Sequence, residues 1–85
     1  MEARLFTLVN AEDSSQVFAV GMEIEDEEQR EAIVYRREDN GHSMIGKHTS
    51  AESALQRFNT LAPMDLIWAD EETIDLDTLF ESMRN

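Results

Sequence analysis

The sequence predicts a small α+β domain: an antiparallel sheet with one helix packed on a face and a short C-terminal helix. Three observations lead to this fold class. They are strand-like alternation through residues 1–48, an Asn-Gly pair between two of these runs, and a change to helical spacing after residue 49. The predicted element order is β-β-β-β-α-β-α. With 85 residues and no internal repeat or linker, we expect one domain, residues 1–85.

The first two strands are predicted from composition and alternation. Residues 3–9 are rich in strand-forming side chains, and the Asn, Asp and Ser residues that follow them indicate a turn. Residues 16–24 are predicted as the second strand, with successive side chains on opposite faces. One face carries Phe18, Val20, Met22 and Ile24, and the other carries Val17, Ala19, Gly21 and Glu23.

The third and fourth strands are predicted to form a hairpin. Residues 31–37 alternate in the same way, and residues 42–48 follow after a short polar segment. That segment contains Asn40-Gly41, which favours a tight turn because both residues tolerate positive φ. The first four strands are therefore expected to make an antiparallel meander.

The pattern changes to a helical period after residue 48. Thr49 is a predicted N-cap, and Glu52 follows three residues later, as in a capping box. Apolar side chains then recur at helical spacing: Ala51, Ala54, Leu55, Phe58 and Leu61. Pro63 is expected to end this helix.

A fifth strand and a final helix complete the predicted order. Residues 64–69 either insert into the sheet or pair at its edge, and a parallel pairing with the fourth strand through a right-handed crossover is also allowed. Asp75 is a predicted N-cap for the last helix, with Ile74 and Leu79 placed as a hydrophobic staple. The apolar stripe of this helix consists of Leu76, Leu79, Phe80 and Met83.

The net charge narrows the classes of partner. Nineteen acids against seven bases give a formal net charge of -12 and a pI near 4.3. Such a field repels nucleic acid and anionic lipid, so we expect neither as a direct partner. It favours a basic partner protein, or high solubility. Abundant acids with a single lysine, Lys47, also occur in proteins from salty cytoplasm, which gives the acidity a second explanation.

Composition favours a cytoplasmic protein. The chain has no cysteine, which suits a reducing compartment. Its start, Met1 to Arg4, lacks the basic and apolar stretches of a secretory signal. The longest uninterrupted apolar run is four residues, Val17 to Val20, too short to cross a membrane.

No motif in the sequence predicts catalysis, a cofactor or a metal. His42 and His48 lie on the same face of one predicted strand but about 20 Å apart, too far to share a metal ion. An EF-hand loop needs a glycine at its sixth position, and no glycine follows Gly46. Nucleophile elbows and phosphate-binding glycine loops do not occur. We therefore expect a non-enzymatic protein without cofactor or metal.

The acids are concentrated in two stretches. The first cluster consists of Glu23, Glu25, Asp26, Glu27, Glu28 and Glu31. The second consists of Asp65, Asp70, Glu71, Glu72, Asp75, Asp77 and Glu81. Segregated charge of one sign steers a positively charged partner. The predicted partner-binding residues are Glu23, Glu25, Asp26, Glu27, Glu28, Asp70, Glu71, Glu72, Asp75 and Asp77.

Two functions fit this sequence. One is a small binding protein whose acidic surfaces engage a basic partner, such as a nucleic-acid-binding protein, as an inhibitor or nucleic-acid mimic. Phage-encoded inhibitors that imitate DNA, some anti-CRISPR proteins among them, are similar in size and acidity alone. The other is a housekeeping or salt-adapted acidic domain that acts in small-ligand binding, homodimerisation or a larger assembly.

Overall fold

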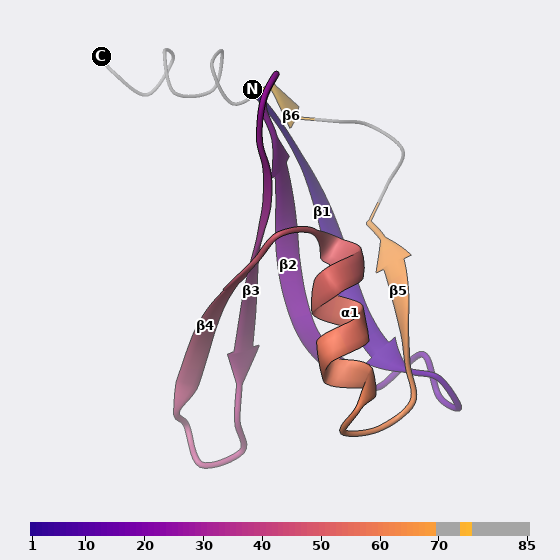
Figure 1. Cartoon of the computed structure of the whole chain (residues 1–85). Helices are drawn as coiled ribbons and strands as arrows, with labels where there is room; N and C mark the ends of the chain where they lie inside the picture. The colour runs from indigo at the N-terminus through magenta and orange to yellow at the C-terminus, as the bar shows by residue number, and fades with distance from the viewer. Residues whose placement is uncertain (70–73, 76–85) are drawn as a thin grey trace.

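A computed structural model shows the fold of the chain and describes residues 1–69 and 74–75 (Figure 1). Its elements are, in chain order, β1 (Glu2–Asn10), β2 (Val17–Glu25), β3 (Arg30–Arg37), β4 (Ser43–His48), α1 (Ala51–Asn59), β5 (Met64–Trp68) and β6 (Ile74–Asp75). The described part is therefore an α+β fold with an antiparallel sheet and one helix, as the sequence predicts.

The strands form one antiparallel sheet in the order β4-β3-β2-β1-β5. β1 to β4 make a meander, as predicted. β5 pairs with β1 at the edge opposite β4, and β6 pairs with β1 near the other end of that strand. Of the placements open to the fifth strand, the structure has the antiparallel edge pairing and not the parallel pairing with the fourth strand. The connection from β4 to β5 crosses the sheet, and α1 lies in it (Figure 1).

The cap of α1 lies one residue later than predicted. Ser50 is the N-cap: its Oγ accepts a hydrogen bond from the Ser53 backbone N–H at 3.0 Å, and the Ser50 N–H donates to Ser53 Oγ at 3.0 Å. The predicted pair of Thr49 and Glu52 is therefore wrong. Thr49 instead donates its hydroxyl to Ser53 Oγ at 3.0 Å and supports the box from outside. The helix ends before Pro63, as expected.

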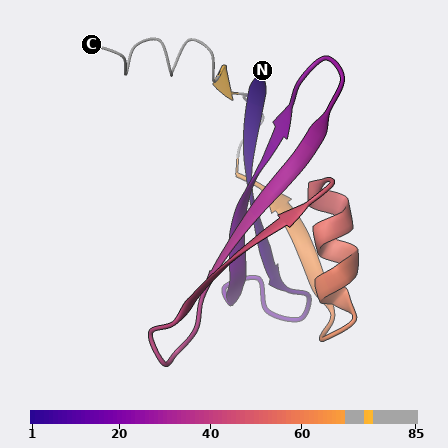
Figure 2. The same cartoon turned by 60° about the vertical axis from the view of Figure 1, so that its left-hand side comes forward.

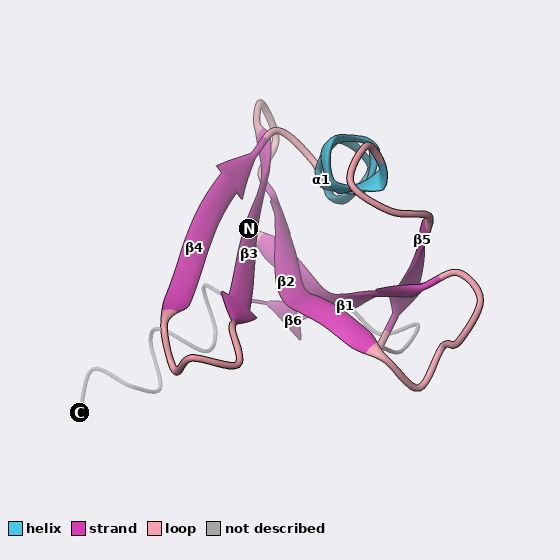
Figure 3. Ribbon diagram, turned by 90° about the horizontal axis from the view of Figure 1, so that it is seen from below, coloured by secondary structure: helices cyan, strands magenta, loops and turns pink. Residues whose placement is uncertain are grey.

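Small side chains let α1 approach the sheet closely. Ala19, Ala32, Ala51 and Ala54 are all buried between the two layers. Larger buried side chains fill the space around them: Phe6, Leu8, Val34 and Met64. Figure 3 shows α1 over one face of the sheet, which we call the helix face.

A β-bulge brings Phe18 to the helix face. The register of β1 against β2 shifts between Leu8 and Val9, and the Phe18 ring packs 5.2 Å from the Phe58 ring of α1. Because two residues of a bulged strand oppose one on its partner, simple alternation fails there. The predicted apolar face of the second strand is therefore split. Its other members lie on the opposite face: Val20, Met22 and Ile24.

The β3–β4 hairpin is present, but its turn is longer than the predicted tight turn. The Glu38 N–H donates to His42 O at 2.8 Å and the Gly41 N–H donates to Glu38 O at 2.9 Å, which leaves residues 39–41 as the loop. Gly41 has φ 88°, and no other described residue has positive φ. Asn40 has negative φ, and its Oδ1 accepts from the His42 N–H at 3.0 Å; both features fit a three-residue loop with glycine in the left-handed position.

The predicted C-terminal helix is not part of the described fold. Ile74 and Asp75, expected at its start, form β6, in which Ile74 pairs with Ala3 and Asp75 with Glu2. The apolar stripe predicted for that helix lies outside the described residues: Leu76, Leu79, Phe80 and Met83.

Candidate functional site

Acidic residues from three strands meet at one end of the sheet. In cross-strand register, Asp75 of β6 lies opposite Glu2 of β1, and Glu2 lies opposite Glu25 of β2. Because neighbouring strands are about 4.8 Å apart, these three positions form a row about 10 Å long. Figure 1 shows β6, the start of β1 and the end of β2 at the same end of the molecule. In backbone register, the row brings one position of the second predicted cluster, Asp75, beside the first cluster.

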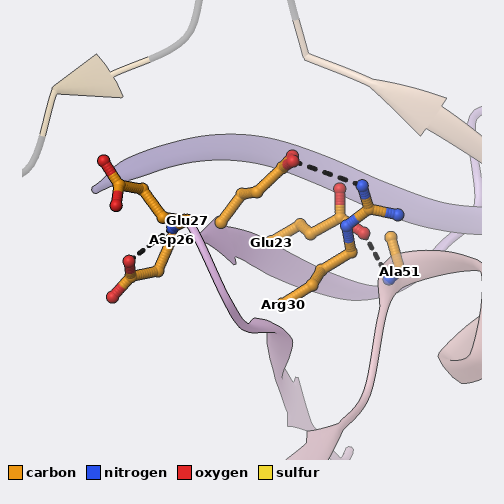
Figure 4. A network of polar contacts seen from close by, with 6 residues as sticks. Glu23, Asp26, Glu27, Arg30 and Ala51 are labelled. Carbon is orange, nitrogen blue, oxygen red and sulfur yellow. Dashed lines mark hydrogen bonds and ion pairs between the residues drawn. The ribbon is translucent and has the colours of Figure 1, made fainter.

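The turn between β2 and β3 extends this row with three more acids. The Asp26 N–H donates to Gln29 O at 2.8 Å, and the Glu27 N–H donates to Asp26 Oδ1, as Figure 4 shows. These bonds fix the backbone, while the side chains of residues 25–28 are exposed. We call the whole set the acidic end; it consists of Glu2, Glu25, Asp26, Glu27, Glu28 and Asp75.

One base of the described part lies against the acidic end. Arg30 Nη2 is 3.4 Å from Glu25 Oε1, and both side chains are more than half exposed (Figure 4). An exposed pair of this kind contributes roughly 0–1 kcal/mol, because water screens it. Among the described side chains, no ion pair reaches Asp26, Glu27 or Glu28.

Glu23 has a different position from the rest of its predicted cluster. It lies in β2 on the helix face, and its Oε1 accepts a hydrogen bond from the Ala51 backbone N–H at 3.1 Å. Ala51 is the first residue of α1, so the Glu23 carboxylate satisfies a helix N–H that has no partner within the helix. The structure therefore gives Glu23 a local structural contact, which Figure 4 shows.

The remaining predicted residues divide into three groups. Glu25, Asp26, Glu27 and Glu28 are brought together at the acidic end, and the backbone of Asp75 lies in the same row. Glu31 belongs to the first acidic cluster but not to the predicted partner-binding residues; it lies on the opposite face from Glu25 and pairs with Lys47 at 3.2 Å. Four predicted residues lie outside the described residues: Asp70, Glu71, Glu72 and Asp77.

Sequence reasoning missed Glu2. It stands alone between Met1 and Ala3, so no cluster marks it. Its place in the row follows from the pairing of β1 with β2 and β6, which depends on strand register across the whole sheet. The sequence did offer one signal. If the first predicted strand is extended by one residue and paired antiparallel with the second, Glu2 falls beside the acids that follow the second strand.

Two titratable groups of the described part have shifted pKa values, and neither lies at the acidic end. Hydrogen bonds from the Ser15 hydroxyl and backbone N–H, at 2.6 and 3.1 Å, lower the pKa of Asp13 in the β1–β2 loop. Burial lowers the pKa of His48, and the positive charge of Arg57 adds to the effect. The His48 ring lies 5.5 Å from the Phe58 ring, whereas His42 is in the β3–β4 turn. The two histidines are thus in different environments.

Across residues 1–69 and 74–75, no group of three or more His, Asp or Glu side chains is arranged to hold a metal ion. No helix within this part of the chain is long and apolar enough to cross a membrane.

Comparison of the chain with protein-family models, with curated proteins and with solved structures gives no significant match in any of the three.

Proposed function

We propose that the protein is a non-enzymatic binding protein whose acidic end engages a basic surface of a partner protein. The observation that carries this proposal is the row formed by Asp75, Glu2 and Glu25, continued by the exposed acids of the β2–β3 turn. It gathers acids from separate parts of the sequence at one end of the sheet. A partner therefore meets a continuous acidic surface rather than isolated charges.

The arrangement carries an energetic cost in the free protein. Glu2 and Glu25 are direct cross-strand partners, and like charges in that position destabilise a sheet. Arg30 offsets this only in part because its contact with Glu25 is exposed. Departures from favourable local chemistry are concentrated at functional sites in natural proteins. A basic partner would remove the repulsion, so its binding would gain free energy from the same feature.

The spacing supports a partner that also binds nucleic acid. Acidic positions about 5 Å apart across the sheet give a linear charge density of the same order as that of one DNA strand, which carries one charge per roughly 3.4 Å of helix axis. Arginines and lysines placed to meet phosphates could meet these carboxylates instead. The protein would then act in the cytoplasm as an inhibitor that occupies a nucleic-acid-binding surface.

A capture experiment with a matched control tests the proposal. The chain is immobilised and exposed to lysate at about 50 mM salt, where the Debye length is roughly 14 Å. A triple variant, Glu25→Gln, Glu27→Gln and Glu28→Gln, is compared with a control triple, Glu12→Gln, Asp39→Asn and Glu52→Gln. Both carry a net charge of -9, from -12 plus 3. Only the first alters the acidic end.

We expect wild type and the control triple to retain the same basic protein, the acidic-end triple to lose it, and duplex DNA to displace it. If both triples retain the protein equally, or if neither wild type nor control captures any basic protein, the acidity serves solubility and the proposal is wrong. If capture depends on the acidic end but DNA does not compete, the binding role stands and the nucleic-acid-mimic role is wrong.

A further inference from the structure

The face of the sheet opposite α1 is largely apolar, although Thr7, Glu31 and Lys47 share it. We call it the open face, and cross-strand register assigns to it eight large apolar side chains: Leu5, Val20, Met22, Ile24, Ile33, Tyr35, Ile45 and Ile67. Part of it forms a shallow hollow of about 440 Å³. Figure 2 shows α1 on one side of the twisted sheet, and within residues 1–69 no second helix covers the other side.

Large side chains on the open face remain in contact with solvent. Leu5 is 47% exposed, Val20 44% and Ile45 75%. An antiparallel sheet with one solvated face normally carries polar side chains there, and contiguous exposed apolar patches mark a binding surface. The helix face, by contrast, uses alanines for close approach. Apart from Phe18, the larger apolar side chains of β2 are thus on the side that α1 leaves uncovered.

The chain beyond β6 is attached beside this face. Ile74 pairs with Ala3, and Ala3 pairs on its other side with Ile24 of the open face. Ten residues follow Asp75, and their apolar members recur at helical spacing: Leu76, Leu79, Phe80 and Met83. As a helix, ten residues extend about 15 Å, enough to cross three strands spaced about 4.8 Å apart.

We propose that residues 76–85 dock on the open face through Leu76, Leu79, Phe80 and Met83, as a second cover opposite α1. Burial at the point of attachment fits this arrangement. Ala3 lies on the open face and is completely buried, whereas Leu5, two residues along the same strand and face, is 47% exposed. Ala3 is flanked in the sheet by Ile24 and Ile74, so this end of the open face adjoins the strand from which residues 76–85 continue.

A second copy of the chain is the weaker occupant. Each copy carries a formal charge of -12, so face-to-face pairing brings two strongly acidic bodies together. A segment of the same chain does not require a second acidic molecule to approach. Its effective concentration is in the millimolar range, well above the concentration of a second molecule in dilute solution. The tether therefore favours the segment of the same chain.

Cysteine cross-linking of the full-length chain tests the proposal, because the native sequence has no cysteine to interfere. Val20→Cys combined with Phe80→Cys places one thiol on the open face and one on the docking segment. Gln56→Cys combined with Phe80→Cys is the matched control, because Gln56 is exposed on α1, on the other side of the sheet. A short bismaleimide reagent joins the thiols, and mass spectrometry separates internal from intermolecular products.

We expect the Val20/Phe80 pair to form an internal cross-link at least about tenfold faster than the control pair, at a rate independent of protein concentration, because docking adds to the tether that both share. Equal internal rates for the two pairs would overturn the proposal. Intermolecular cross-linking of Val20→Cys alone, with dimers in light scattering, would overturn it in favour of a second copy.

A second measurement does not depend on cross-linking chemistry. The double variant Leu79→Ser and Phe80→Ser should increase binding of a hydrophobic dye severalfold and shift the NMR signals of Leu5, Val20 and Ile45, while Thr78→Ser with Ser82→Ala should do neither. Unchanged dye binding and unchanged signals in the first variant would contradict docking. None of these substitutions touches the acidic end, so this proposal and the proposed function can fail separately.

Discussion

Glu23 Oε1 accepts a hydrogen bond from the Ala51 backbone N–H at 3.1 Å, so a side chain of β2 caps the first turn of α1. Ser50 and Ser53 satisfy other groups at the same helix end. The carboxylate also complements the partial positive charge of the helix N-terminus. This contact joins the helix to the sheet and explains why one member of the first acidic cluster is separated from the acidic end.

Replacing Glu23 should therefore lower stability in a graded way. Glu23→Ala removes the acceptor and the charge and should cost about 1–2 kcal/mol, whereas Glu23→Gln keeps an acceptor oxygen and should cost about half as much or less. Chemical denaturation at neutral pH measures both. Glu27→Gln, at the acidic end, is the control and should leave the midpoint unchanged or raise it. Equal midpoints for Glu23→Ala and wild type would show that the contact has no energetic weight.

Gly21 should not tolerate even alanine. A Cβ atom at this position would collide with the Phe6 ring, which lies over Gly21, and would come 2.9 Å from the Ile33 carbonyl oxygen. Because Phe6 is buried in the core, it cannot move aside freely. Gly21→Ala should cost about 1–3 kcal/mol, as overpacking does in other cores. Gly46→Ala is the comparison: its Cβ would meet only the His48 ring, at 3.2 Å. A smaller loss for Gly21→Ala than for Gly46→Ala would contradict this packing.

Gly41 tests the hairpin loop. Its φ of 88° lies where residues with a Cβ are disfavoured, although nothing lies within 4 Å of a Cβ placed there. Any loss of stability must therefore come from the backbone. Gly41→Val should cost roughly 1–3 kcal/mol, and Gly41→Asn should cost less because asparagine tolerates this region better. If valine and asparagine have the same effect in thermal unfolding, the positive φ is not the cause.

His48 should make stability depend on pH just below neutrality. Burial and the charge of Arg57 lower the pKa of His48, so the unfolded chain binds a proton more readily than the folded one. Its contribution should be fully present above the ordinary histidine pKa of about 6.5 and be lost as pH falls from there through the folded-state pKa. The measurement is the difference in melting temperature between wild type and His48→Asn. This difference should decrease as pH is lowered from 7.5 to 5. Arg57→Gln should make this pH dependence weaker, because it removes one cause of the lowered pKa of His48. A melting-temperature difference that does not change with pH would contradict the prediction.

Much of the fold could be predicted from the sequence because local patterns determine it. Alternation located β1 to β4, helical spacing located α1, and the break at Pro63 placed β5 close to its observed start. The errors have local causes that one sequence does not reveal. Consecutive serines and a threonine offered several caps, and the hydrogen bonds of Ser53 decide for Ser50. The bulge that turns Phe18 toward α1 has no composition signal.

The candidate site could be predicted only in part. The turn acids Glu25 to Glu28 are recognisable because they are consecutive. Glu2 and the alignment of Asp75 with Glu25 depend on which strands pair and in what register, and those are properties of the whole sheet. Glu23 shows the converse. Alternation along β2 places Glu23 on the opposite face from Ile24 and its cross-strand partner Glu31, but only the packing of α1 shows what Glu23 contacts.

The rate at which the protein associates with the basic partner isolated by capture tests the central claim most directly. Stopped-flow mixing at about 50 and 500 mM salt compares wild type with the two triple variants, which share a net charge of -9. Electrostatic steering changes association rates by about 10- to 1,000-fold. For the triple variant Glu25→Gln, Glu27→Gln and Glu28→Gln we expect at least a tenfold loss of association rate at low salt, within that range. The control triple should associate at near-wild-type rates, and all three proteins should converge at high salt. Equal rates for the two triples would show that only total charge matters and would contradict a binding role for the acidic end.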